Sequence, residues 1–331
     1  MKKLLPALAV LAFTAGLLAR PEAVSAAVRE GLTLCYQTVI PSLFPFFAAV
    51  GLLTRLGLAR WLQGLCRPFM GPMFRLRGAC AMPLLAGLLG GYPSGAQTTA
   101  ELWRQGQLSR REAELLLGFA NNCGPAFLLS FIGAGVLGSS RAGVWLLVVH
   151  IAAALVTGMV LCRLIPGREA PPSPPASGTQ EGSLPRAVTA SVSGALTSTL
   201  SICAYVTLFR AVMALLPGDL PAWALGFFEL VSGAAALEPG PAGFVTAAGL
   251  AAWGGLSVHC QTMAVTEGLS LRWHWVGKAI QAGVSVLLAR LAAKGLFRRC
   301  GARRPHIANE LIASPCRREF PPPWEPGTSW R

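Results

Sequence analysis

The chain has 331 residues, of which 53% are hydrophobic and 13% are charged, and its formal net charge is +14. Because soluble domains contain about 25% charged residues, this composition excludes a globular protein with a water-facing surface and predicts an integral membrane protein. The excess of basic residues suits cytoplasmic loops and tails beside anionic lipid. Nucleic-acid binding is not expected, because no basic stripe interleaved with aromatic residues accompanies the charge.

The N-terminal residues are expected to form an anchor. Met1-Lys2-Lys3 and the apolar stretch 4–19 suit either a cleaved signal peptide or an uncleaved helix. The many apolar segments downstream favour the uncleaved helix. Residues 20–30 are then expected to form a short interfacial helix.

The first half, 31–165, is predicted to contain several apolar spans. The run at 31–58 includes Pro41 and Pro45, each of which removes a backbone hydrogen bond, so a kink or break is expected there. The arginine-rich stretch 55–77 contains no acidic residue and is expected to be a cytoplasmic loop. Further expected elements are a broken apolar segment at 79–100, an amphipathic surface helix at 101–117 with the capping-box pattern Ser109-Arg110-Arg111-Glu112, and spans at 119–137 and 143–165.

A proline-rich linker is predicted to separate this half from a second one. Its composition of Pro, Ser, Gly and Gln cannot build a core. The second half is expected to contain apolar runs at 187–216 and 222–237, a second broken segment at 243–265 and a last span at 275–297. The expected divisions are therefore 1–30 (anchor), 31–165 (first half), 166–186 (linker), 187–297 (second half) and 298–331 (a basic, proline-rich, disordered tail).

The two broken segments share a pattern. Each has a double glycine followed by Gln-Thr-x-Ala, at Gly90–Ala100 and Gly254–Ala264, with an offset of 254 − 90 = 164. Glycine and proline free backbone groups that hydrocarbon cannot satisfy, so such breaks persist only where they are buried in protein or line a cavity. Paired interruptions in two halves of a membrane protein indicate a transport site. If both segments are re-entrant, seven crossings remain and the termini lie on opposite faces; if the second crosses fully, both termini are inside.

Polar groups beside these breaks are the predicted solute site. Neutral amides and hydroxyls can bind a small polar molecule without the desolvation cost of fixed charges, although they could instead hold helices together. The predicted substrate-binding residues are Ser94, Gln97, Thr98, Asn121, Asn122, Ser257, His259, Gln261 and Thr262. The predicted backbone breaks are Gly90, Gly91, Pro93, Gly95, Gly254 and Gly255.

Ionisable residues at membrane depth cost about 2.5–3.5 kcal/mol each, so they default to function or to pairing. Glu229 is a candidate group for coupling to a proton or cation; the alternatives are a pair with Arg210 or a cap on an unwound helix. His259 could relay protons or could be satisfied by a backbone carbonyl. His150 is expected to be a core or lumen-facing residue, and Arg210 to extend toward the interface.

Neither catalysis nor a cofactor is predicted. The segment Gly90–Gly95 is not a phosphate-binding loop, because no Gly-Lys-Ser/Thr follows it. The nine cysteines occur singly, without a C-x-x-C pair, so neither a zinc site nor a dithiol redox motif is supported.

Four motifs together resemble the YlbJ-like sporulation integral membrane proteins, which carry a nucleoside-recognition, or Gate, domain. The resemblance runs from about Pro21 to the last span, and its motifs are Pro41-Ser42-Leu43-Phe44-Pro45-Phe46, Leu89-Gly90-Gly91-Tyr92-Pro93-Ser94-Gly95-Ala96, Asn121-Asn122-Cys123-Gly124-Pro125 and Gly254-Gly255-Leu256-Ser257-Val258-His259. It implies a protein of endospore-forming bacteria that moves dipicolinic acid across the outer forespore membrane. The Gate domain is also similar to domains of concentrative nucleoside transporters and ferrous-iron transport proteins, which implies hairpins that meet in mid-membrane.

We therefore expect an all-α polytopic membrane protein of two repeat-like halves, each with a broken or re-entrant hairpin, in a Gate architecture like that of the concentrative nucleoside transporters. The expected function is transport or conduction of a small polar anion, with dipicolinate as the solute. Membrane lipid and either a second copy or other sporulation membrane proteins are the expected partners. The alternatives are a nucleoside carrier, and an assembly factor that recruits partners through its basic tail.

Overall fold

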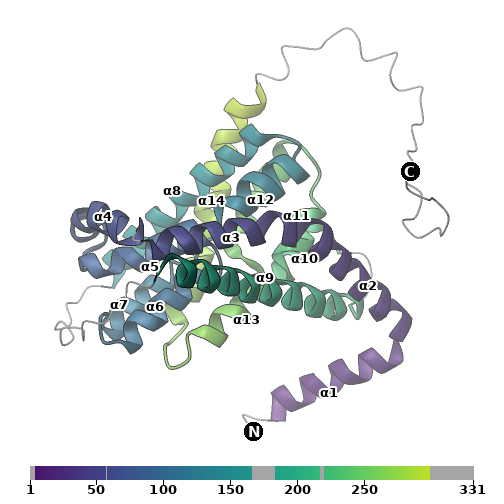
Figure 1. Ribbon diagram of the computed structural model, residues 1–331. Helices are drawn as coiled ribbons and strands as arrows, with labels where there is room; N and C mark the ends of the chain where they lie inside the picture. The colour runs from purple at the N-terminus through teal and green to yellow at the C-terminus, as the bar shows by residue number, and fades with distance from the viewer. Residues whose placement is uncertain (1–3, 57, 166–182, 217–219, 299–331) are drawn as a thin grey trace, which may run out of the picture.

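The computed structural model describes residues 4–56, 58–165, 183–216 and 220–298. Every regular element within these ranges is a helix, which confirms the predicted all-α fold (Figure 1). The elements are α1 (Leu4–Ala19), α2 (Pro21–Leu34), η1 (Cys35–Val39), α3 (Ile40–Arg55), α4 (Leu58–Phe74), η2 (Gly78–Cys80), α5 (Ala81–Gly90), α6 (Ser94–Arg104), α7 (Arg110–Leu117), η3 (Phe127–Val136), α8 (Ser140–Leu164), α9 (Leu184–Ala214), α10 (Ala222–Phe228), α11 (Leu230–Ala235), α12 (Pro241–Trp253), α13 (Gly255–Val265) and α14 (Arg272–Arg298).

The helices are those of an integral membrane protein. Four stretches of the described chain are long and apolar enough to cross a membrane, namely α8, α9, the consecutive helices α12 and α13, and α14; two bent helix pairs raise the number to six if each pair is one span. Large apolar side chains such as Val148, Leu200 and Leu291 are exposed on α8, α9 and α14. Since all three helices also pass the length and hydropathy test, these exposed faces suit contact with lipid tails.

The N-terminal helices form a bent, continuous path. The axes of α1 and α2 differ by 101°, and α1 points away from the rest of the bundle (Figure 1). Helix α2 does not end near residue 30 as predicted but continues through the π-helical turn η1 into α3. The amide of Ile40, directly before Pro41, donates to the carbonyl of Cys35, five residues earlier. A π-helical turn therefore precedes the proline pair, where the sequence predicted a kink or break.

The arginine-rich stretch predicted as a loop is instead the helix α4. Its apolar residues Met70 and Phe74 are buried, and the Phe74 ring stacks on Phe119 with centroids 5.2 Å apart. Arg67, on the same helix, is exposed. The loop prediction was wrong because the positive-inside rule reports the side of the membrane and not the local backbone conformation, and burial of one apolar face is enough to form a helix.

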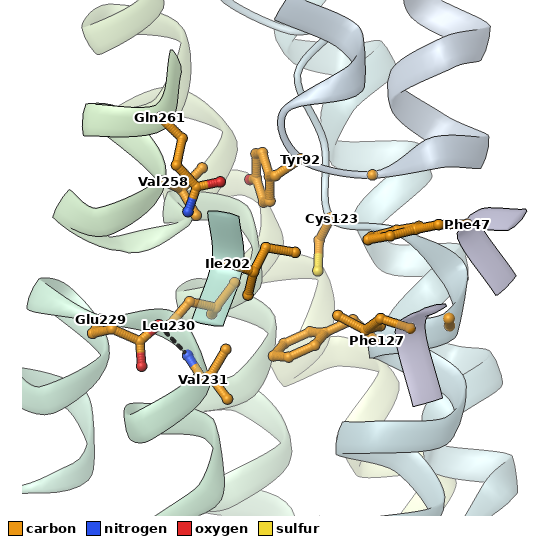
Figure 2. Close-up of a pocket in the computed structure, with 14 residues that line it drawn as sticks. Phe47, Tyr92, Cys123, Phe127, Ile202, Glu229, Leu230, Val231, Val258 and Gln261 are labelled. Carbon is orange, nitrogen blue, oxygen red and sulfur yellow. Dashed lines mark hydrogen bonds between the residues drawn. The ribbon is translucent and has the colours of Figure 1, made fainter. Parts of the chain in front are cut away.

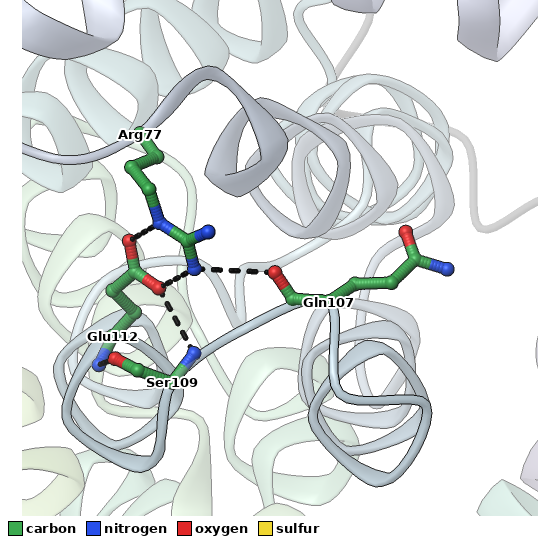
Figure 3. A network of polar contacts seen from close by, with 4 residues as sticks. All are labelled: Arg77, Gln107, Ser109 and Glu112. Atoms are coloured by element: carbon green, nitrogen blue, oxygen red, sulfur yellow. Dashed lines mark hydrogen bonds and ion pairs between the residues drawn. The ribbon is translucent and has the colours of Figure 1, made fainter. Parts of the chain in front are cut away.

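The predicted capping box is confirmed at the start of α7 (Figure 3). The surface helix predicted at 101–117 is instead divided between the end of α6 and α7, and α7 buries Leu115, Leu116 and Leu117. Ser109 Oγ accepts a bond from the Glu112 amide at 3.2 Å, and Glu112 Oε2 accepts one from the Ser109 amide at 2.9 Å. Arg77, which lies just before η2, also donates from Nε to Glu112 Oε1 at 2.7 Å. This contact ties α7 to the start of the first broken segment.

The first broken segment is a helical hairpin, as predicted. Helices α5 and α6 pack against each other and are joined by Gly91, Tyr92 and Pro93, which form its tip. Glycine permits the close approach: a Cβ on Gly95 would lie 3.0 Å from Gly87 Cα and 2.1 Å from the carbonyl oxygen of Ala120.

The second hairpin lies earlier in the chain than the Gly-Gly pattern predicted. The run 222–237 divides into α10 and α11, which pack against each other with Glu229 between them. A Cβ on Gly233 would lie 2.1 Å from Gly226 Cα, so this hairpin also crosses through paired glycines. The Gly254 break instead separates α12 from α13, which continue as one candidate span.

Each hairpin tip rests on a helix break elsewhere in its own half. A Cβ on Gly91 would lie 2.9 Å from both Cα and N of Gly124, and one on Gly255 would lie 3.0 Å from the amide of Leu230. Gly124 belongs to the irregular stretch between α7 and η3, so the span predicted to begin at residue 119 begins without regular structure. Glu229 at the second tip therefore corresponds to Gly91 at the first, an offset of 229 − 91 = 138 residues. Gly255 at the second break corresponds to Gly124 at the first, an offset of 255 − 124 = 131 residues, and neither offset is the 164 of the sequence pattern.

The two halves share one order of elements. A hairpin (α5 with α6, or α10 with α11) is followed by two helices separated by a break (α7 and η3, or α12 and α13) and then by a long helix (α8 or α14). The helix after the break (η3) packs on the long helix α8 in the first half, whereas the helix before the break (α12) packs on α14 in the second; α8 and α14 pack on each other. This order confirms the predicted repeat-like halves.

Two predicted regions lie largely beyond this description. Residues 166–182 of the linker and 299–331 of the tail fall outside the described residues. At the far end of the linker, α9 begins at Leu184, so residues 184–186 are helical.

Candidate functional site

A small cavity lies between the two hairpin tips (Figure 2). Its volume is about 50 Å³, which is room for a few water molecules and far below the roughly 300–1,000 Å³ of most ligand pockets. It is lined by both tips, the first break and the helices α3, η3, α9, α11 and α13. The lining residues are Leu43, Phe47, Gly91, Tyr92, Cys123, Gly124, Ala126, Phe127, Ile202, Glu229, Leu230, Val231, Val258 and Gln261.

Tyr92, at the first tip, links the two halves. Its side chain is buried, and its hydroxyl donates to the carbonyl of Ala251 at 3.1 Å. Ala251 lies in the last turn of α12, directly before the second break. Gly91 has φ 75°, a conformation that glycine adopts readily and other residues do not, which lets the chain reverse just before Tyr92.

Glu229, at the second tip, caps a helix. It is buried, and its carboxylate accepts the amides of Val231 at 2.9 Å and Ser232 at 2.6 Å, so it is the N-cap of α11. Arg210 instead pairs with Glu30, 3.4 Å away. Glu229 therefore caps a helix, as one of the predicted alternatives had it, and does not pair with Arg210. Its coupling role stays a prediction.

Asn121 and Asn122 join the first break to the second half. Asn121 Nδ2 donates to Thr262 Oγ1 at 2.8 Å, and Asn122 Oδ1 accepts from Gln281 Nε2 at 2.8 Å. Both asparagines are fully buried. His150, also buried, accepts the amide of Cys123 at 3.0 Å, in agreement with its predicted core position.

Lys278 of α14 is the buried charge that the sequence analysis missed. It is completely buried, and its ammonium donates to the Tyr92 hydroxyl at 3.0 Å and to the carbonyl of Asn121 at 2.5 Å. It also reaches the carbonyl of Ala252 at 3.3 Å and Gln281 Oε1 at 3.0 Å. Its signal was present in the sequence, because a lysine inside an apolar span is a functional candidate by the same rule that selected Glu229.

His274 was missed in the same helix and pairs with His259. The two rings are bonded through His259 Nδ1 and His274 Nε2 at 2.8 Å, and His274 Nδ1 lies 3.0 Å from the carbonyl of Leu117. Since a carbonyl only accepts, the neutral His274 carries its proton on Nδ1, so His259 Nδ1 is the donor of the pair. The Nε2 atom of His259 is then a buried acceptor without a partner.

Several buried polar atoms of the described residues have no hydrogen-bond partner, and one of them, Gln261 Oε1, belongs to a residue that lines the cavity. They include Asn121 Oδ1, Gln261 Oε1, His259 Nε2 and Ser232 Oγ. Because an unsatisfied buried polar atom costs about 1–3 kcal/mol, such a group marks a place where a water or a polar ligand would bind favourably.

The structure separates the predicted site residues into two groups. Buried near the breaks are Asn121, Asn122, Ser257, His259, Gln261 and Thr262, and Gln261 lines the cavity itself. On α6, Ser94 and Thr98 are half-buried and Gln97 is exposed, and none of the three lines the cavity. The predicted break residues Gly90, Gly91, Pro93, Gly95, Gly254 and Gly255 all lie at or beside the first tip and the second break.

Metal-binding clusters of three or more His, Cys, Asp or Glu residues are absent from the described part of the chain. The predicted absence of catalysis stays a prediction. What the site offers chemically is a small cavity between two hairpin tips, with one capped carboxylate, a buried ammonium nearby and several unsatisfied polar atoms.

Fold and site together define a polytopic helical membrane protein with two hairpins around a small, mostly apolar cavity whose lining includes Tyr92, Glu229 and Gln261. Comparison with known proteins agrees. Residues 37–137 match the Gate family, which is described as nucleoside recognition, and this range contains the first hairpin and the first break. The chain is thus a helical membrane protein that is similar to the Gate family over residues 37–137.

The chain is also similar, over part of its length, to one curated protein. The chain is 35% identical over 151 residues to the sporulation integral membrane protein YlbJ of Bacillus subtilis (strain 168). The match covers 46% of this chain and 37% of that protein, so the chain spans little more than a third of the relative's length. The predicted resemblance to YlbJ-like proteins is confirmed, over a shorter range than expected. No solved structure matches the chain.

Proposed function

We propose that the protein transports or conducts a small polar anion, with dipicolinate as the solute, across the outer forespore membrane during sporulation. One observation carries the transport part of this proposal: both hairpin tips line the same cavity, and each tip rests on a helix break. Paired interruptions of this kind provide a solute with backbone and side-chain partners at membrane depth.

The cavity is too small for dipicolinate in the arrangement described. About 50 Å³ does not hold a pyridine ring with two carboxylates, so a tip has to withdraw before the solute enters. The tips are suited to such movement because each is short and is joined to its neighbours through glycines. The similarity to YlbJ supports the proposed link to sporulation. Dipicolinate is a small polar anion and therefore belongs to the proposed class of solute.

Dipicolinate flux into proteoliposomes tests this function. Gln261 lines the cavity with an unpartnered Oε1, whereas Gln97, at the same position of the other Gln-Thr-x-Ala pattern, is exposed. We expect Gln261→Ala to reduce flux about tenfold or more, since a lost hydrogen bond to a charged group is worth about 1.5–3 kcal/mol. Gln97→Ala is the matched control and should retain flux close to that of the unchanged protein.

Two other outcomes would assign a different function. Absence of flux in the folded, unchanged protein, combined with loss of sporulation when the chain is truncated after Phe297, would favour the assembly factor. Flux of uridine in place of dipicolinate would favour a nucleoside carrier. The rings of Phe47, Tyr92 and Phe127 at the cavity give that second candidate a structural basis, because they could stack on a nucleobase (Figure 2).

A further inference from the structure

Lys278 is a buried charge without a charged partner. Its ammonium contacts a hydroxyl, a side-chain amide oxygen and two backbone carbonyls, and all four groups are neutral. None of the ion pairs among the described residues involves Lys278. The carboxylate of Glu229 at the cavity is already bonded to the amides of Val231 and Ser232. A fixed cation in a membrane-spanning helix is costly unless it is paired, so this charge is available to an anion.

The lysine is held in place by several segments. Ala252 belongs to the last turn of α12, where unpaired carbonyls give a partial negative charge, and Asn121 lies in the first break. Gln281 is one turn along α14, and it also bonds to Asn122. These contacts fix the ammonium between the two breaks without neutralising it.

Tyr92 stands between Lys278 and the cavity. It lines the cavity and accepts a hydrogen bond from the ammonium, which also lies 4.9 Å from the centre of its ring. Of the four groups that Lys278 contacts, only Tyr92 belongs to a hairpin tip. Withdrawal of this tip, hinged at Gly91, would remove the hydroxyl from the ammonium and open a path from the cavity to the charge.

We propose that Lys278 binds a carboxylate of the transported anion, and that the Tyr92 hydroxyl holds this position on the ammonium while the first hairpin is closed. The inference rests on the proposed function, since it identifies the solute as a small carboxylate. A carboxylate oxygen replaces the Tyr92 oxygen on Lys278 Nζ, so the ammonium exchanges a bond to a neutral hydroxyl for a stronger bond to an opposite charge.

Binding to the purified full-length protein in detergent tests the role of the charge. The probes are dipicolinate and its neutral diamide, pyridine-2,6-dicarboxamide, with affinity measured by calorimetry. We expect the unchanged protein to prefer dipicolinate and Lys278→Met to weaken dipicolinate binding about tenfold or more. Lys294→Met is the matched control, because Lys294 lies on the same helix and is exposed; its affinity should be unchanged. Size-exclusion chromatography and thermal melting verify that each variant is folded.

Tyr92→Phe provides a test that a merely structural role would not pass. It removes the competing hydroxyl and keeps the ring, so dipicolinate binding should tighten by roughly threefold or more. If Lys278→Met does not fold, the Tyr92→Phe variant and the comparison of dipicolinate with the diamide still test the proposal. Equal affinity for dipicolinate and the diamide, or unchanged or weaker binding in Tyr92→Phe, would overturn the proposal.

The same variants in proteoliposomes separate the two proposals. Dipicolinate flux that is unaffected by Lys278→Met would overturn the lysine site and leave the transport function standing. Binding that depends on Lys278 without any flux would overturn the transport function and leave the site. A folded, unchanged protein that neither binds nor moves dipicolinate would contradict both.

Discussion

Glu112 shows how this protein stabilises a charge outside its membrane-spanning segments. Burial alone would raise the pKa of its carboxyl, but hydrogen bonds from Arg77 and Ser109 outweigh burial and hold the pKa below its ordinary value (Figure 3). The bond to Glu112 in turn raises the pKa of the Arg77 guanidinium. The contrast with Lys278 is clear, because that charge has only neutral partners.

The depressed pKa of Glu112 predicts a loss of stability in acid. The ionised carboxylate stabilises the fold at any pH above its unfolded pKa of about 4.5, and this contribution is lost as the pH falls through the lower, folded pKa. Glu112→Gln should lower stability at neutral pH by about 1–3 kcal/mol and flatten the acid slope of thermal melting in detergent. Glu101→Gln, at an exposed glutamate, is the control; an unchanged acid slope in Glu112→Gln would contradict the expectation.

The hairpins and the helix breaks depend on different local devices. The first tip and the second break use glycines with positive φ, at Gly91 (75°), Gly254 (92°) and Gly255 (80°). The second tip uses a side chain, because Glu229, whose own backbone is extended, caps α11. Since a carboxylate cap has no glycine or proline signature, the second hairpin could not be found from the pattern that revealed the first.

Gly91→Ala and Gly255→Ala should damage the fold to a similar extent. Each adds a Cβ about 3 Å from backbone atoms of a neighbouring segment, at a positive φ that costs of order 1–3 kcal/mol for other residues. Gly283→Ala on α14 is the control, because nothing lies within 4 Å of its added Cβ. Thermal melting in detergent measures all three. If only one of the first two variants is destabilised, the two tip-to-break contacts are not equivalent.

Contacts between the two halves keep the molecule closed. Tyr92 bonds to Ala251, Asn121 to Thr262, and Asn122 to Gln281, so residues of the first tip and first break are tied to the second half. These contacts surround a cavity of only about 50 Å³. Under the proposed transport function, movement of a solute would require some of these contacts to break together, in a two-state opening of a hairpin.

Cys123 reports on this opening. It lines the cavity and is buried, whereas Cys66 on α4 is half-buried. In single-cysteine variants in liposomes, a membrane-permeant maleimide should label Cys66 readily and Cys123 slowly. Dipicolinate turnover should then accelerate the labelling of Cys123 several-fold without changing that of Cys66. A Cys123 rate that does not depend on the solute would indicate a pathway that bypasses the tips.

The similarity of the two Gln-Thr-x-Ala patterns did not correspond to a structural equivalence. The two Gln-Thr-x-Ala copies appeared equivalent, but Gln97 is exposed on a hairpin helix and Gln261 lines the cavity on an interrupted crossing. The same letters therefore occupy different environments, because an offset in sequence does not report which segment packs against which. The equivalence that does exist links a glycine tip to a glutamate cap, and no residue pattern shows it.

The sequence by itself determined the membrane class, the helical content, the positions of the first tip and second break, and the capping box at Ser109. Each of these depends on composition or on residues within a few positions of one another. The tertiary structure decided which tip meets which break, placed the second hairpin at Glu229, and brought Lys278 to Tyr92, 186 residues away. Those contacts depend on the packing of distant helices through close glycine crossings, and local residue preferences carry no information about such packing.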